Sequence, residues 1–298
     1  MKTHSRALII TLGLLLGISI GFIAFIAFFC GDSLLWTSYL QSPNEIYNME
    51  SGIIYNAMDF RPGQDYELRY DFENSEYSQL KEQYEIEEIA GDGSEFDRAK
   101  NLMNEFSGRL THKSDYDNHI AMNALDLLEY SLDNKSQGIN CRSKAQILNE
   151  MCLALGIYSR KVWIMPNSVY DGDCHVVNEV WDSEYGKWVM LDITNNMYWV
   201  DETGMPLSVL EIRDRIGQQE FCTPADANDG LNDLDKSLSN NFGSFLYIAK
   251  NMVWMQYCEE NTVDESELMY LLFPENINTD YEYIISREAV EAGPHHNT

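Results

Sequence analysis

Three residue types that together perform acyl transfer occur in this chain: a cysteine, a histidine and an aspartate. Cys141 stands in "GINCRSKAQILNEMCLALGI", residues 138–157, between a turn-forming Gly-Ile-Asn and a run with helical periodicity. His175 stands in "CHVVNEVW", and Asp192 follows "KWVML". A thiol that gives its proton to an imidazole becomes a nucleophile, and a carboxylate behind the imidazole fixes its tautomer. The trio predicts attack on an amide or ester carbonyl through a thioester.

The residues around Cys141 predict that it lies in the first turn of a helix. Asn140 suits the N-cap and Gly156 suits the end of the helix. The apolar positions between them form one stripe: Ala145, Leu148, Met151, Cys152 and Leu155. The partial positive charge of a helix N-terminus favours thiolate over thiol. The backbone N–H of Cys141 would also help to hold the oxyanion, whereas the sequence identifies no second donor.

A β-hairpin is predicted to bring His175 and Asp192 together. "SEYG", residues 183–186, supplies a four-residue turn with Gly186 available for positive φ. This turn pairs Asp182 with Lys187, so His175 lies diagonal to Asp192 on the same sheet face. We expect an imidazole nitrogen about 2.6 to 3.2 Å from a carboxylate oxygen.

The ordered combination of these segments resembles the transglutaminase-like superfamily. Cys141 matches the family's nucleophile, His175 its base and Asp192 its orienting carboxylate. The framework positions that also match are Gly156, Ile157, Arg160, Val162, Glu179, Val180, Trp188 and Thr194. The chain departs from the family pattern at Val177, Ile164 and Ile193, where tryptophan, glycine and proline are frequent. These departures leave the trio intact and alter the surrounding walls.

The resemblance, over about residues 95–215, implies an α+β fold of the papain-like cysteine type, in which the cysteine-bearing helix packs on an antiparallel sheet. It implies a protein or peptide substrate and no cofactor. Hydrolysis and transfer to an amine both remain open, because water or an amine can resolve a thioester. The alternative is a non-catalytic binding or scaffold module of the cell envelope that keeps the fold. Arg160 is assigned to structure, through a salt bridge or a network of backbone carbonyls.

The cysteines allow two other roles, a zinc site and a disulfide. A zinc site of Cys141, Cys174, His175 and Asp192 is disfavoured, because adjacent residues of a strand point to opposite faces. A disulfide between Cys222 and Cys258 stays open in an oxidising exterior.

The apolar run at residues 7–29 predicts a transmembrane anchor. Its 23 uncharged residues suffice to span about 30 Å as a helix. A cleaved signal peptide is the alternative, but it has a shorter apolar core and a small-residue cleavage site. Lys2 and Arg6 precede the run, so the positive-inside rule places residues 1–6 in the cytoplasm and the rest outside a single-pass cell membrane anchor.

The formal charge of −28 argues against nucleic acid as a partner. It suits a cationic substrate, although acidic surfaces also simply keep exposed domains soluble. Beyond the anchor we expect a juxtamembrane region at 30–92, the transglutaminase-like domain at 93–216 and a packed C-terminal extension at 217–298. Within the last two regions, "SVLE" at 208–211 predicts a capped helix, 218–241 a long loop and "YEYIIS" at 281–286 a strand.

Overall fold

The computed structural model describes residues 13, 15–22, 43–133, 136–228 and 243–294. Its contacts divide the chain into two units, residues 1–49 and 50–298, and the second holds all of the described strands. Among the described residues, no helix combines the length and apolarity needed to cross a bilayer. Apart from residues 13 and 15–22, the predicted anchor at 7–29 lies outside the described residues and stays a prediction.

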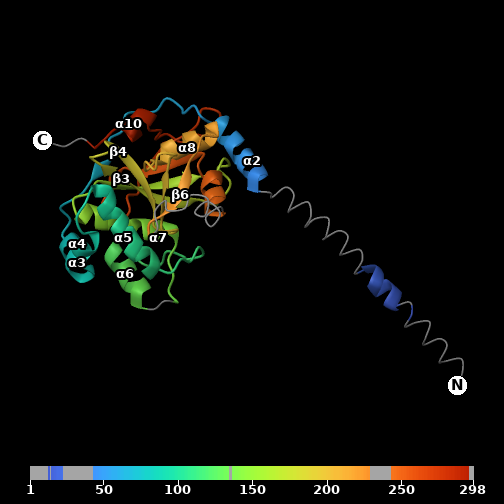
Figure 1. Cartoon of the computed structure of the whole chain (residues 1–298), viewed down its shortest axis with the longest axis horizontal. Helices are drawn as coiled ribbons and strands as arrows, with labels where there is room; N and C mark the ends of the chain where they lie inside the picture. The colour runs from blue at the N-terminus through green and yellow to red at the C-terminus, as the bar shows by residue number, and fades with distance from the viewer. Residues whose placement is uncertain (1–12, 14, 23–42, 134–135, 229–242, 295–298) are drawn as a thin grey trace, which may run out of the picture. The chain divides into compact units, whose positions relative to one another are not determined.

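A seven-stranded sheet forms the centre of the second unit (Figure 1). Its strands lie in the order β6-β5-β4-β3-β2-β7-β9, and each neighbouring pair is antiparallel. Its strands are β2 (Ser159–Met165), β3 (His175–Asp182), β4 (Lys187–Asp192), β5 (Met197–Val200), β6 (Thr223–Asp226), β7 (Trp254–Cys258) and β9 (Met269–Leu272). A second, two-stranded sheet joins β1 (Arg69–Tyr70) to β8 (Glu260–Asn261). The observed fold is α+β with an antiparallel sheet, as predicted.

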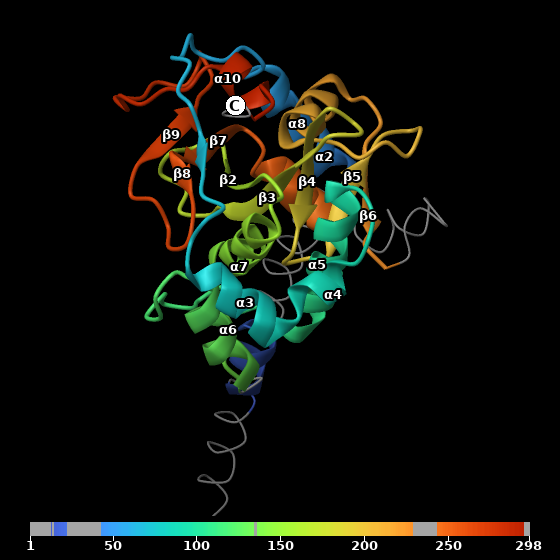
Figure 2. The ribbon, with the colours of Figure 1, turned by 90° about the vertical axis from the view of Figure 1, so that its left-hand side faces the viewer.

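Helices from the middle of the chain gather on one side of the large sheet (Figures 1 and 2). They are α3 (Glu76–Tyr84), α4 (Ile86–Ala90), α5 (Glu95–Arg109), α6 (Ala124–Asp133) and α7 (Cys141–Ala154). The remaining helices are α2 (Pro43–Tyr55), α8 (Val209–Gln218), residues 243–250 and α10 (Arg287–Glu291). Helix α7 contacts both β2 and β3 and the helices α3, α5 and α6, so it lies at the centre of this layer.

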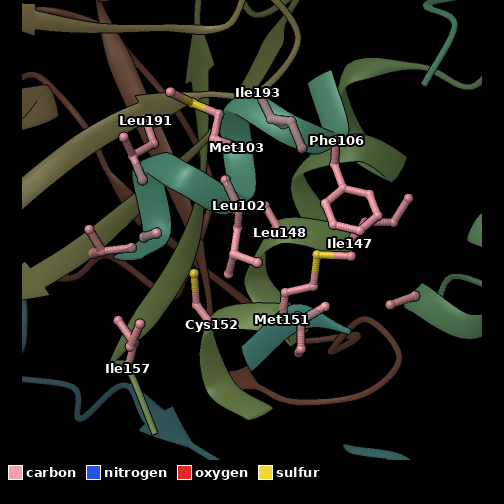
Figure 3. Packing of buried hydrophobic residues seen from close by; sticks show 14 of the residues in the cluster. Leu102, Met103, Phe106, Ile147, Leu148, Met151, Cys152, Ile157, Leu191 and Ile193 are labelled. Atoms are coloured by element: carbon pink, nitrogen blue, oxygen red, sulfur yellow. The ribbon is translucent and has the colours of Figure 1, made fainter. Parts of the chain in front are cut away.

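The main core fills the space between α5, α7 and the sheet. Leu102 and Phe106 of α5 meet Leu148 and Met151 of α7, and Leu191 of β4 closes the cluster (Figure 3). All five side chains are fully buried. Each such residue stabilises the fold by about 1.5 to 3 kcal/mol relative to an exposed position. This packing holds α7 rigidly against the sheet that carries the histidine and the aspartate.

Local capping signals from the sequence are confirmed. The Asn140 side chain accepts the backbone N–H of Ser143, and Gly156 ends α7 with a φ of 73°. Ser208 and Glu211 form the capping box of α8. The helix ends at Gln218.

Two predictions for the C-terminal part are wrong. Residues 223–226 lie in the predicted loop 218–241 but form β6, an edge strand in which Pro224 is tolerated because an edge leaves one side of the backbone unpaired. Residues 281–286 form no strand and make isolated bridges instead, from Ile284 to Leu271 and from Ile285 to Gln64.

Candidate active site

Cys141 is the first residue of α7 and lies at the edge of the core. Its side chain is partly exposed, whereas every residue from Ser143 to Ala154 is buried. The helix N-terminus directs its free N–H groups and its partial positive charge toward this end. Cys141 is therefore reachable from solvent while its helix is fixed by packing.

The hairpin of β3 and β4 places His175 and Asp192 side by side. Asp182 pairs with Lys187, and Gly186 in the turn has a φ of 65°, as predicted. His175 begins β3 and Asp192 ends β4, so both side chains reach the same end of the sheet. The His175 Nε2 atom lies 2.9 Å from Asp192 Oδ2, which confirms the predicted pairing of the two side chains.

Asp192 is held in place by a full set of hydrogen bonds. Its Oδ1 atom accepts the backbone N–H groups of Thr194 at 3.0 Å and Asn195 at 3.2 Å. Its Oδ2 atom accepts the Asn195 side-chain amide at 2.7 Å in addition to the imidazole. The aspartate is completely buried, and these donors offset the cost of burying its charge.

The Cys141 thiol completes the row. The His175 side chain and the backbone N–H of Val176 both lie close enough to the thiol to lower its pKa. Cys141 comes from a helix and His175 and Asp192 from two strands, so three separate elements meet at this point. The structure thus brings all three predicted residues together.

Electrostatics at the site favours an ion pair between the thiolate and the imidazolium. Burial raises the pKa of Cys141, but the hydrogen bond and charge of His175 outweigh it and leave the pKa below its usual value. Burial lowers the pKa of His175, but the charge of Asp192 and the hydrogen bonds to Asp192 and Cys141 raise it to about 10. The imidazole therefore holds the proton more strongly than the sulfur does near neutral pH.

Contacts that the sequence did not indicate support the histidine. The ring of Tyr247 lies edge-on to the imidazole, with 5.5 Å between ring centroids. The Tyr247 hydroxyl oxygen lies 3.1 Å from the Cys174 carbonyl oxygen and 3.0 Å from the Asp173 carboxylate, so its single proton is shared between these two acceptors. Lys250 binds the same carboxylate at 2.7 Å. Helical residues 243–250 thus fix the start of β3, but they lie too far along the chain for local patterns to reveal this.

The buried salt bridge predicted for Arg160 is confirmed. Its guanidinium donates to Glu179 Oε2 through Nε at 2.9 Å and through Nη2 at 2.6 Å. The guanidinium carbon also lies 3.9 Å from the centroid of the Trp188 ring. Glu179 Oε1 accepts the backbone N–H of Val209 at 2.8 Å, so the pair joins two strands to the start of α8. This group is part of the scaffold.

Neither of the two alternative roles of the cysteines, a zinc site or a disulfide, is seen among the described residues. No group of three or more His, Cys, Asp or Glu side chains arranged to hold a metal is found in the described part of the chain. Cys222 and Cys258 are both free, buried thiols.

A cavity of about 520 Å³ lies near the start of α7, where Arg142 lines it together with Trp163 and Met269. Cys141 and Met269 both pack against the buried cluster that contains Trp163. A larger cavity of about 1240 Å³ is lined by Tyr158 and Arg160, at the opposite end of β2. The smaller cavity therefore lies at the same end of α7 as Cys141.

A family model and solved structures are similar to parts of this chain. Residues 83–193 match the family model described as "Transglutaminase-like superfamily". A proposed cysteine protease from Cytophaga hutchinsonii aligns with 18% identity and a TM-score of 0.32, over 41% of this chain and 40% of that one. A proposed protease from Parabacteroides distasonis aligns with 18% identity and a TM-score of 0.28, over 40% of this chain and 23% of that one. None of the curated proteins compared with the chain matches it.

Proposed function

We propose that this protein is a cysteine enzyme that acts on amide bonds through a thioester at Cys141, since residues 83–193 match the model of the transglutaminase-like superfamily. The observation that carries the proposal is the row of Cys141, His175 and Asp192, in which His175 is hydrogen-bonded to Asp192 and lowers the pKa of Cys141. A scaffold module would have no physical reason to keep a buried imidazolium between a thiol and a carboxylate.

Each residue of the row has a defined task in the proposed reaction. The Cys141 thiolate attacks the carbonyl carbon, and the backbone N–H of Cys141 stabilises the tetrahedral oxyanion. His175 then gives its proton to the leaving amine as the C–N bond breaks, which leaves a thioester. Asp192 holds the imidazole and stabilises its positive charge throughout. Water or a second amine resolves the thioester, with His175 acting as the base.

The acyl donor is proposed to be a protein or peptide. Its side chain would occupy the 520 Å³ cavity near the start of α7, where Asp264 and Glu267 contribute carboxylates and Trp163 contributes a ring. The overall charge of −28 also favours a substrate that carries positive charge. The alternative of a non-catalytic envelope module predicts binding of the same peptides without turnover.

A peptide library separates these outcomes. The protein is incubated with peptides, with and without a primary amine, and acylated Cys141 is sought by intact-mass analysis. We expect a thioester adduct in the wild type, its absence in Cys141→Ala, and a cleaved or amine-linked product. Binding of peptides without adduct or product would favour the scaffold alternative.

Residues 7–29 are proposed to anchor this domain at the outer face of a membrane. The apolar run and the preceding Lys2 and Arg6 support the anchor and its orientation. Protease added to intact cells should degrade residues 30–298. Protection of the whole domain would contradict the orientation, and release of the domain into the soluble fraction would contradict the anchor.

A further inference from the structure

Lys144 is a buried cation that has no direct partner in the described part of the chain. Lys144 belongs to α7 and is 2% exposed, yet its side chain makes no hydrogen bond or ion pair with the described residues. Other buried cations are paired: Arg160 binds Glu179 at 2.6 Å and Lys161 binds Glu265 at 2.5 Å. Burying a lysine side chain without a counter-ion costs free energy, so the position of Lys144 requires a physical explanation.

Lys144 lies three residues after Cys141 on the same helix. Residues at this spacing share one face, and helical side chains lean toward the N-terminus, so Lys144 extends toward the cysteine. The negative groups in electrostatic range of its ammonium are Asp192 and Cys141. Within the described part of the chain, these two groups are the negative charges that act on the Lys144 ammonium.

Asp192 is not available as a close partner. Both of its oxygens already accept two hydrogen bonds each, from His175 and Asn195 on one side and from two backbone N–H groups on the other. A carboxylate offers about four such positions. The remaining negative charge near Lys144 is the charge that develops at the sulfur of Cys141.

We infer that the Lys144 ammonium is the counter-charge of the Cys141 nucleophile and stabilises the anionic sulfur before and during acyl transfer. This inference rests on the proposed function, since it assigns Lys144 a part in the same reaction. Lys144 acts through Cys141 and is a positioning residue in this account. The partly charged helix N-terminus and His175 act on the same sulfur from two other directions.

The titratable groups around the Lys144 ammonium set the pH range in which Lys144 is charged. Burial lowers the pKa of Lys144 to about 8, and Asp192 and Cys141 oppose that change. A backbone bridge places His112 next to Ile139. Partial burial and the charges of Lys144 and His175 lower the pKa of the His112 imidazole. His112 is thus mainly neutral at pH 7, while Lys144 is mainly charged below pH 8.

The test is the pH dependence of Cys141 alkylation in the full-length protein. Iodoacetamide is applied between pH 5 and 10, and modified Cys141 is separated from Cys174 by peptide mass spectrometry. The variants are Lys144→Met, which keeps the length of the side chain without its charge, and Lys144→Arg, which keeps the charge. Lys100→Met is the matched control, because it removes one positive charge from α5, where Lys100 pairs with Asp97 at 2.8 Å.

Lys144→Met should move the midpoint of the alkylation profile upward by about one pH unit, which is about tenfold in rate on the rising limb. Lys144→Arg and Lys100→Met should keep the wild-type midpoint. The inference fails if a folded Lys144→Met protein, judged by circular dichroism, keeps the wild-type midpoint. If wild-type Cys141 itself titrates like an ordinary thiol, the proposed function fails as well, so the two failures are distinguished by the wild-type curve.

Discussion

The His175 Nε2 atom lies 2.9 Å from Asp192 Oδ2, across two adjacent antiparallel strands, and both side chains are buried. This contact depends on the parity of the hairpin, because a shift of one residue would send the two side chains to opposite sheet faces. Because Asp192 takes Nε2, Nδ1 is the ring nitrogen left to exchange a proton with Cys141. The turn of the hairpin therefore decides whether the histidine and the aspartate can pair.

Asp192→Asn should reduce turnover by about 10²- to 10⁴-fold, because the amide favours the wrong imidazole tautomer and no longer stabilises the imidazolium. Asp182→Asn is the matched control: Asp182 is equally buried on the same hairpin and accepts the Phe96 N–H at 3.0 Å, at the far end from Cys141. Both variants should lose about 1 to 3 kcal/mol of stability. Equal losses of activity per folded molecule would contradict the role of Asp192.

Arg160→Met should lower the free energy of unfolding by about 3 to 5 kcal/mol, because it leaves the buried Glu179 without its counter-ion. Urea denaturation measures this change. The double variant Arg160→Met with Glu179→Gln should recover part of the loss, since no unpaired charge remains. Arg69→Met serves as the control, because Arg69 is about half exposed, with 54% side-chain accessibility, and should change stability by less than about 1 kcal/mol. A loss for Arg160→Met no larger than this would contradict the scaffold role.

Glu150 should make the protein less stable as pH rises. It is 1% exposed and accepts the Gln146 side-chain amide at 2.7 Å and the Ala124 N–H at 2.9 Å. Burial raises its pKa from 4.5 to about 8, so the folded state keeps a proton that the unfolded state releases. Its contribution to stability is complete below pH 4.5 and is lost as pH rises toward 8.

Glu150→Gln keeps the hydrogen-bond acceptor and removes the titration. Its thermal midpoint should exceed that of the wild type at pH 8 by an amount equivalent to about 4 kcal/mol, with little difference at pH 4. Glu105→Gln, at a side chain with 50% accessibility, should show no such pH dependence. A constant difference between Glu150→Gln and wild type across this range would contradict the buried, protonated state.

Local signals in the sequence were sufficient to predict the row of Cys141, His175 and Asp192. Asn140 fixed the start of the helix, and the four-residue turn ending at Gly186 fixed the register of the hairpin. Both signals act within a few residues, where steric and hydrogen-bonding preferences decide the backbone. Their outcome does not depend on how distant segments pack.

The surroundings of the row depend on tertiary packing and were not predictable in the same way. The apolar stripe of α7 indicated one buried face, whereas helices on one side and the sheet on the other bury every residue from Ser143 to Ala154. Lys144 is polar and therefore gave no sign of burial in the sequence. Tyr247 reaches His175 from a segment about 70 residues further along the chain, and only the folded structure brings the two together.

The most direct test of the account is whether Cys141 is an activated nucleophile. Iodoacetamide should already alkylate Cys141 at pH 6 to 7, faster than it alkylates an ordinary thiol, since the pKa of Cys141 lies below the usual value for a thiol. Cys152, whose pKa burial raises to about 12, should stay unmodified as an internal control. His175→Ala should shift the reaction of Cys141 to higher pH. If wild-type Cys141 reacts with a midpoint near that of a free thiol, and His175→Ala makes no difference, the enzyme account is contradicted.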